Sequence, residues 1–321
     1  MHASYARLEC YGARAVDNVT HSLVGLNLAH AFFKRKFPEA VPALVLSSNL
    51  PDVDGLVLLA PHPLAVIWRR TFGHSVFLIP ILALALAWLL HRGYRRSSFV
   101  ALWILCLGGA YLHLFFDLIN SFGVVLLWPF SDWRPELAMV FIIDLALLAV
   151  LAVPHLLRFW QAGRARLSTT CRWSAALVAA YLMFCGANRA YAQWKLDRTL
   201  GKGAAFSYVF PEPLGPHRWR CVVRRDEERY SEFLFHSLSG QSDPILVVPT
   251  FPNSPAVLRA RASPYAKRLE WFFKAPVWRT EVDGAHVYDL RFRPLVLQRG
   301  VSFEYVFAPD GSLKGNRRGT H

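Results

Sequence analysis

Four long apolar segments constrain this chain more than any other feature. They cover residues 75–91, 99–119, 137–157 and 173–190. A helix needs roughly 20 apolar residues to cross the hydrocarbon core of a bilayer, and each segment is close to that length. Hydrophobic residues make up 54% of the chain, which is more than soluble domains usually contain. The sequence therefore predicts an α-helical membrane protein built on a bundle of four transmembrane helices.

Two shorter apolar stretches precede the bundle, at residues 19–33 and 39–50. They predict two short N-terminal helices that lie partway into the membrane or at its surface. Towards the C-terminus the apolar runs end, and short β-type runs alternate with Gly, Pro and Asp turns. We therefore predict a membrane-embedded helical domain over 1–195 and a small β-rich extramembrane domain over 196–321. The final residues, 311–321, are predicted to form a disordered tail.

Lys and Arg concentrate in three of the connections between the apolar segments. The chain carries a formal charge of +14, and basic residues cluster around 34–36, 92–96 and 158–172, whereas the connections 51–74 and 119–136 carry acidic residues. Because cytoplasmic loops are enriched in Lys and Arg, we expect the basic turns in the cytoplasm and the acidic connections outside. This pattern accounts for the positive charge, so we expect membrane lipids as partners and no bound nucleic acid.

Four motifs containing His or Asp lie near the ends of the predicted helices. The run HLFFD places His113 and Asp117 four residues apart, on one face of a helix. The upstream motifs DNVTHS, NLPDVD and FGHS supply His21, Asp52, Asp54 and His74. The charge pattern puts all four motifs at the same, non-cytoplasmic end of the bundle. Since imidazoles and carboxylates are costly to bury unless they are paired or bound to a metal, we expect one shared site.

The donor set of this site is typical of a metal centre. Neutral imidazoles and carboxylates bind divalent metals, most often zinc, with manganese and iron as alternatives. Three His and three Asp exceed what one tetrahedral ion with an open position needs, so we expect two ions that activate water against a phosphoester. In this assignment one ion has three ligands: His74, His113 and Asp117. The second is held or bridged by His21 with one or both of Asp52 and Asp54.

Each motif alone is also typical of ordinary structure, such as a hydrogen-bonded buried His or a capped turn; the metal hypothesis rests on their convergence. Asp17 precedes His21 by one turn and could be a further ligand or orient the His21 ring. Arg69 and Arg70 could neutralise an anionic substrate. Two Arg at a membrane boundary more often anchor lipid headgroups, however, and we expect that role for them.

Asp144 and His286 are two further polar residues outside these motifs. Asp144 lies inside the third long apolar segment, where a carboxylate is a functional candidate by its location. A pairing with a nearby polar side chain is equally compatible with the sequence, the candidates being Arg134, Asn188 and Arg189. His286, in the predicted β-rich domain, has no partner motif, and we expect no site there.

Taken in order, the motifs resemble a known family. DNVTHSLVG, NLPDVDG, FGHS and HLFFDLINSFGVVLLWPFS are similar to the motifs of the YdjM-type bacterial inner-membrane proteins, described as membrane-bound metal-dependent hydrolases. The resemblance covers roughly residues 17–146 and implies a multi-pass protein of the inner membrane. One departure is Gly73, which stands where Thr is common, directly before the preserved His74.

The family is in turn distantly similar to zinc-dependent phospholipase C and P1-type nucleases, which are helical and bind a zinc cluster. This analogy implies the same metal ligands as above, with one of Asp52 and Asp54 doubling as a catalytic general base. The expected function is a phospholipase C-like phosphoesterase that acts on a lipid or lipid-linked substrate. The alternative is a non-enzymatic membrane anchor, with a structural metal and a partner-binding C-terminal domain. Transport has less support, because no inverted repeat is evident.

Overall fold

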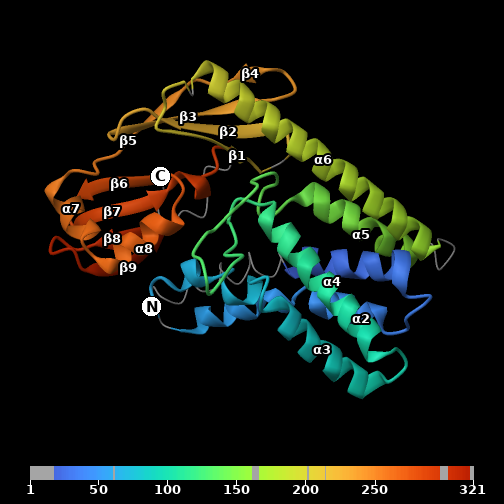
Figure 1. Cartoon of the computed structure of the whole chain (residues 1–321). Helices are drawn as coiled ribbons and strands as arrows, with labels where there is room; N and C mark the ends of the chain where they lie inside the picture. Colours follow the sequence, from blue (N-terminus) through green and yellow to red (C-terminus); the bar gives the residue numbers. More distant parts are fainter. Residues whose placement is uncertain are drawn as a thin grey trace. The chain divides into compact units, whose positions relative to one another are not determined.

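The computed structural model describes residues 18–60, 62–160, 166–200, 202–213, 215–296 and 303–318. The described residues divide into two compact units, one within Met1–Ala60 and Trp68–Phe184 and the other within Pro61–Ile67 and Cys185–His321. The first unit is helical, and the second contains all the β-strands (Figure 1). The division falls inside helix α6 (Leu167–Thr199), which runs from one unit into the other. The predicted domain boundary at 195/196 stays a prediction.

The helical unit begins with a helix over residues 18–28 that continues into a π-helical turn, η1 (Ala29–Phe33). The elements that follow before α6 are α2 (Ala40–Ser47), η2 (Leu50–Leu59), η3 (Ala65–Trp68), η4 (Phe72–His74), α3 (Ile79–Tyr94), α4 (Phe99–Leu118) and α5 (Leu145–Trp160). Most of η3 falls in the segment Pro61–Ile67, which groups with the second unit. In the described part of the chain, α4 and α6 are each long and apolar enough to cross a membrane. The number rises to four if each of two bent helix pairs, α2 with η2 and residues 65–74 with α3, is one span. The helical membrane character is thus confirmed, with two to four candidate spans.

The prediction of a third transmembrane helix over 137–157 is wrong for the N-terminal part of that range. The helix α5 begins only at Leu145, and residues 137–144 run outside any helix. The backbone of this segment bonds instead to the end of α4, with the Leu137 amide 2.7 Å from the Leu118 carbonyl and the Met139 amide 2.7 Å from that of Ile119. The segment is apolar but irregular, and only Ala138 and Val140 in it are buried; apolar composition alone does not distinguish such a segment from a helix.

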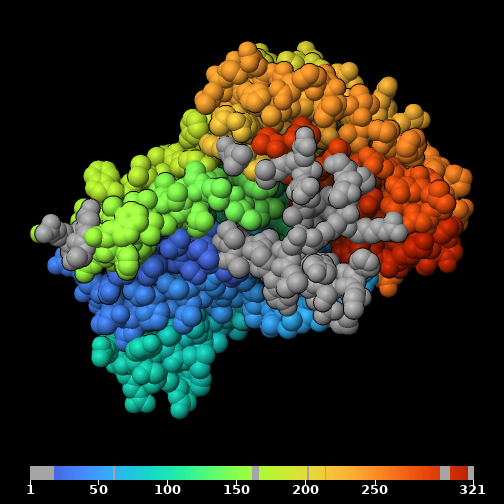
Figure 2. Space-filling view, turned by 180° about the vertical axis from the view of Figure 1, so that it is seen from behind, coloured from blue at the N-terminus to red at the C-terminus, as the bar shows by residue number. Residues whose placement is uncertain are grey.

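Helix α4 forms the centre of the helical unit. Ser98 caps its N-terminus by accepting a hydrogen bond from the Ala101 amide, which satisfies one of the donors left open at a helix start. Gly109 lets α2 approach closely, because a Cβ at that position would lie 2.0 Å from the Ser47 Oγ. Buried Leu, Ala and Cys side chains of α2, α3 and α4 form one core. The teal residues of α3 and α4 project from the rest of this unit in Figure 2.

The second unit contains two antiparallel sheets. The first has the order β1-β2-β3-β4, with β5 also paired to β3, and the second has the order β6-β7-β8-β9. The strands are β1 (Phe206–Pro211), β2 (Arg218–Arg224), β3 (Arg229–His236), β4 (Gln241–Ser242), β5 (Leu246–Pro249), β6 (Pro276–Glu281), β7 (Gly284–Asp289), β8 (Phe303–Phe307) and β9 (Leu313–Arg318). Phe210, Tyr230 and Tyr288 belong to one buried cluster, so side chains of both sheets share a core.

The predicted β-rich C-terminal region is confirmed, with two differences. Residues 313–318 form β9, which pairs with β8, so the prediction of a disordered tail is wrong for them; residues 319–321 lie outside the described residues. Two short helices, α7 (Pro255–Arg261) and α8 (Pro264–Phe272), also interrupt the strands. Ser254 and Ser263 cap these helices, and a proline follows each cap at the first helical position. A 3-10 turn, η5 (Leu290–Phe292), follows β7.

Candidate metal centre

His113 and Asp117 lie one turn apart on α4, and both side chains are buried at 1% exposure. Nδ1 of His113 lies 2.7 Å from the carbonyl oxygen of Ser48, at the end of α2. A carbonyl oxygen only accepts, so Nδ1 carries the hydrogen and donates it. The other ring nitrogen, Nε2, therefore presents a lone pair, which is the form of imidazole that binds metals.

His74 is held in the same way by a carboxylate. It ends the short turn η4 (Phe72–His74), and its Nδ1 lies 2.9 Å from Oδ2 of Asp54 on η2. The same oxygen accepts a hydrogen bond from the Thr71 amide at 2.8 Å. Gly73 allows the two turns to meet, because a Cβ there would lie 2.1 Å from the Pro51 carbonyl oxygen. The lone pair of His74 Nε2 is thereby directed away from Asp54, towards α4.

Three lone-pair atoms meet at this point. His74 Nε2 lies 3.1 Å from His113 Nε2 and 2.9 Å from Asp117 Oδ2, and His113 Nε2 lies 3.6 Å from the same oxygen. Two ligands of one tetrahedral zinc ion are about 3.3 Å apart, because Zn–N distances are about 2.0–2.1 Å. With both rings neutral, in the tautomers set by Ser48 and Asp54, neither Nε2 atom carries a hydrogen to donate. The three atoms are then spaced as ligands of one cation would be, whereas protonation of His74 would let its Nε2 donate to Asp117 instead.

His21, from the helix over 18–28, adds a third imidazole. Its Nε2 lies 3.3 Å from the other carboxylate oxygen of Asp117, Oδ1, and its ring stacks on that of His113 with centroids 3.8 Å apart. The two oxygens of Asp117 thus face different histidines, as the oxygens of a bridging carboxylate would. His21, His113 and Asp117 can each offer one atom to a shared ion.

The two Asp residues of the PDVD motif lie in different surroundings. Asp52, His74 and His113 can also offer one atom each to a common ion, although the Asp52 oxygens contact Arg69 and Asn18. Asp54 is fully buried behind His74, and its Oδ1 has no hydrogen-bond partner among the described residues. The six predicted site residues are thus brought together, while their roles as ligands or bases stay predictions. Asp17 lies outside the described residues.

The expectation that Arg69 and Arg70 anchor lipid headgroups is wrong. Arg70 is only 2% exposed, and its Nε lies 2.6 Å from Oδ2 of Asp117. Its backbone is left-handed, with φ of 56°, a conformation that non-glycine residues rarely adopt. NH1 donates to Asn120 at 2.8 Å, and Arg69 donates to Asp52 at 2.9 Å. Both cations belong to the site, where they partly balance its carboxylates.

Asp144 has a structural role that involves none of the three candidate partners. Its Oδ1 accepts a hydrogen bond from the Leu147 amide at the start of α5. Its Oδ2 accepts one from the Tyr181 hydroxyl at 2.7 Å. The side chain therefore caps α5 and ties it to α6.

His286, for which the sequence suggested no partner, has carboxylate partners in the structure. In β7, its buried ring lies between two carboxylates, with Nε2 2.7 Å from Asp283 and Nδ1 3.2 Å from Glu304. Glu281, His286 and Glu304 could each offer one atom to an ion. The signal that sequence reasoning missed is the strand register, which places Val306, two residues beyond Glu304, opposite His286.

The fold and the site together define a helical membrane protein with a buried His and Asp cluster fit for a metal. Residues 16–192 match the YdjM inner membrane protein family, so the chain belongs to that family. It is 24% identical over 294 residues to a Bacillus subtilis (strain 168) protein named uncharacterized protein YfhP, over 86% of this chain and 85% of that protein. No solved structure matches the chain.

Proposed function

We propose that this protein is a membrane-bound, metal-dependent hydrolase, a phospholipase C-like phosphoesterase that acts on a lipid or lipid-linked substrate. The observation that carries the proposal is the meeting of His74, His113 and Asp117, whose Nε2 and Oδ2 atoms lie 2.9–3.6 Å apart, close to the spacing of ligands around one ion. Arg70 balances the charge of Asp117, but two facing neutral imidazole nitrogens are unfavourable in a buried site unless a cation or a proton lies between them.

Each residue of the site has a proposed task. His74, His113 and Asp117 Oδ2 hold one ion, and His21 with Asp117 Oδ1 contributes to a second, with Asp52 as a further ligand or as the general base. When bound, the ions, most plainly zinc, would activate a water molecule and neutralise the phosphoryl oxygens. Asp54 keeps the His74 ring in the tautomer that binds metal. Arg69 and Arg70, both in ion pairs with site carboxylates, supply positive charge for an anionic substrate.

We further propose that the helical unit spans the inner membrane four times. In that arrangement α3, α4, α5 and α6 would each cross the membrane once, and α2 with η2 would extend partway into it. The basic connections would face the cytoplasm, and the metal centre with the β-rich unit would face the periplasm. A phospholipid headgroup lies at the depth of such a site, which supports a lipid substrate.

One observation favours a second function. His74, His113 and Asp117 are all at most 1% exposed, and a structural metal site is closed by protein ligands whereas a catalytic one keeps an open position. On this alternative the metal only stabilises the bundle, which anchors the β-rich unit as a partner-binding module. The two functions differ in whether a water ligand can exchange.

The first experiment is metal analysis of the full chain, purified gently in detergent and compared with H113A and D117A. We expect bound zinc in the wild type and its loss in both variants, while H155A, which alters a histidine of α5, retains it. Wild-type protein that binds no divalent metal would sink the proposal. Substituting cobalt for zinc then separates enzyme from scaffold, because an exchangeable ligand lets added phosphate shift the cobalt spectrum and a closed site does not.

A further inference from the structure

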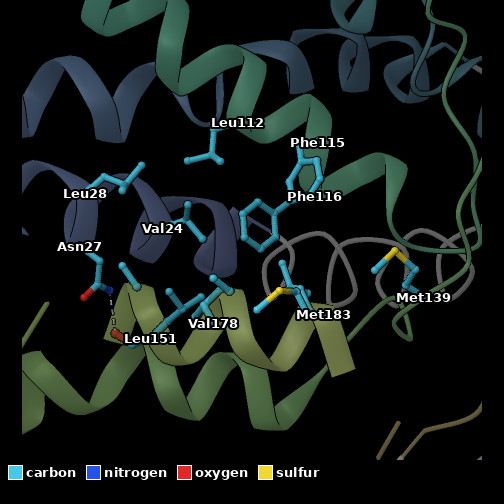
Figure 3. A pocket seen from close by; sticks show the side chains of 13 residues that line it. Val24, Asn27, Leu28, Leu112, Phe115, Phe116, Met139, Leu151, Val178 and Met183 are labelled. Carbon is cyan, nitrogen blue, oxygen red and sulfur yellow. Dashed lines mark hydrogen bonds between the residues drawn. The ribbon is translucent and has the colours of Figure 1, made fainter. Parts of the chain in front are cut away.

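An apolar cavity of about 420 Å³ lies in the helical unit beside the metal centre. Figure 3 shows its lining side chains, which come from the helix over 18–28, from α4, α5 and α6, and from the segment around Met139. Asn27 is the only polar side chain among the described residues that line it. Its amide nitrogen donates to the Leu23 and Leu151 carbonyls, so the cavity offers almost purely hydrocarbon contacts.

The wall of the cavity adjoins the metal centre, although none of the six predicted site residues lines the cavity. Phe116 lines it and directly precedes Asp117, and the Phe116 ring meets the His21 ring edge-on, with centroids 6.5 Å apart. Val24 lies one turn after His21 and also lines the cavity. The helices that hold the metal centre therefore present its ligands on one side and the cavity wall on the other.

From Phe116 and Val24 the cavity extends along the same helices. It extends from Phe116 back to Leu112 on α4 and from Val24 on to Leu28 on the first helix. On α6 the lining residues run from Met183 to Ala175, about 12 Å at a rise of 1.5 Å per residue. In Figure 3, Leu28 lies at one end of the labelled residues and Met139 at the other, with Phe116 between them. The cavity is thus an elongated apolar slot whose wall at Phe116 and Val24 adjoins the metal centre.

We propose that this slot binds one hydrocarbon chain of the lipid whose phosphoester reaches the metal centre, an inference that rests on the proposed function. Both candidate spans of full length, α4 and α6, line the slot, so its surroundings in a bilayer are hydrocarbon. Its volume is about three times that of a cavity known to hold a benzene ring, which suits one chain rather than two. The shared Phe116 wall would align that chain with the site.

The proposal is tested by substitutions that fill the slot with a large side chain. Ala179 lines it on α6, and A179W would occupy the space of the chain, whereas A180W places the same ring on the next residue, which is not among the lining residues. The full chain is assayed with hexadecyl and ethyl p-nitrophenyl phosphate, which share one scissile P–O bond. Water adds to phosphorus and p-nitrophenolate leaves in both.

We expect A179W to lower kcat/KM for the hexadecyl ester more than about tenfold, because one methylene in an apolar pocket already changes it by roughly 10- to 200-fold. Hydrolysis of the ethyl ester should not change, and A180W should match the wild type. Equal losses on both esters, or no loss on either, would overturn the chain-binding role. A175L, a smaller filling, repeats the test if A179W does not fold.

A second measurement separates failure of this inference from failure of the proposed function. The protein is reconstituted in phosphatidylglycerol vesicles that contain a lipid with a photoreactive diazirine in mid-chain, and the cross-linked residues are mapped. Cross-links concentrated on Leu112, Val178 and Leu182, and lost in A179W, support the chain site even if neither ester is hydrolysed. Cross-links spread evenly with exposed residues such as Ile104, or insensitive to A179W, overturn it.

Discussion

His74 and His113 point their Nε2 atoms at each other across 3.1 Å, although each ring donates its hydrogen from the opposite nitrogen. Two lone pairs at this distance repel unless a cation lies between them or one ring is protonated. The backbone carbonyl behind His113 and the carboxylate behind His74 keep both rings in place. The fold thus fixes both rings in the orientation that a preorganised metal site would require.

Replacement of Asp54 tests whether this carboxylate orients a ligand or is one. We predict that D54N lowers the zinc affinity by about 10- to 100-fold, the usual effect of losing a carboxylate behind a ligating histidine. The neutral Asn oxygen still accepts from His74 Nδ1, so binding should weaken without being lost. The affinity is measured by competition with a chelator of known strength.

H113A is the reference for that measurement, because it removes a ligand atom and should abolish binding. If D54N loses zinc as completely as H113A, Asp54 is itself a ligand. If D54N has no effect, the Asp54–His74 pair has no role in metal binding.

The parts of the site that sequence predicts well are those with a local period. His113 and Asp117 lie four residues apart in a helix, so their common face follows from helical geometry alone. Asp54 and His74 lie on separate 3-10 turns, and only tertiary packing sets their contact. Arg70 shows the same limit of sequence-based prediction. A basic residue at a membrane boundary is predicted to anchor headgroups, and only the tertiary structure shows that Arg70 is buried against Asp117.

The fold has a matching limit around α5. Residues 137–144 are as apolar as a transmembrane helix, yet they form an irregular segment bonded to the end of α4. The hydropathy of this segment carries no information on its backbone conformation. In the second unit the strand runs were predictable from their alternation and turn residues, whereas β9 was not, since its residues, LKGNRR, lack β-branched and aromatic side chains.

Arg70 provides a prediction that depends on metal occupancy. R70M removes the cation beside Asp117 and leaves that carboxylate buried without it. We expect the free energy of unfolding of the metal-free protein to fall by about 3–5 kcal/mol, the usual cost of breaking a buried ion pair. Zinc should restore much of this loss, because a bound ion supplies positive charge at the same place. Thermal unfolding in detergent, with chelator and with zinc, measures both values.

R69M is the matched control, because the Arg69–Asp52 pair is more exposed, with side chains 14% and 10% accessible. Its loss should cost less, about 1 kcal/mol or below, and depend less on zinc. An R70M loss that is the same with and without zinc would contradict a metal beside Asp117.

The close approach of η4 to η2 accounts for the glycine at position 73, where the family commonly has Thr. A Cβ there would meet the Pro51 carbonyl oxygen at 2.1 Å and the Val53 side chain at 3.2 Å, so η4 would have to move away from η2. We predict that G73A lowers the free energy of unfolding by about 1–3 kcal/mol, as overpacking does, and weakens zinc binding by displacing the adjacent His74. G55A is the control, since a Cβ at Gly55 meets nothing within 4 Å. Equal behaviour of the two variants would show that the close approach is not needed.

Glu232 gives a pH-dependent prediction in the β-rich unit. It is fully buried on β3, and neither carboxylate oxygen has a hydrogen-bond partner among the described residues. Burial raises the pKa of Glu232, and the nearby carboxylate of Glu212 adds to the effect, while Arg220 and Arg293 oppose it. The folded chain therefore holds this proton more tightly than the unfolded chain, where the pKa is about 4.3.

The sign of the effect follows from proton linkage. Below the pKa of the unfolded chain, Glu232 is protonated in both states and does not lower the free energy of unfolding. As pH rises through the raised pKa of the folded chain, the contribution of Glu232 to the free energy of unfolding falls, and above that pKa it stays low. We expect E232Q, a neutral isostere, to raise the unfolding temperature of the full chain at pH 7 and to leave it nearly unchanged at pH 4. E227Q, at an exposed position on the turn before β3, should change neither value. An E232Q protein less stable than the wild type at pH 7 would mean that the Arg220 and Arg293 charges outweigh the burial.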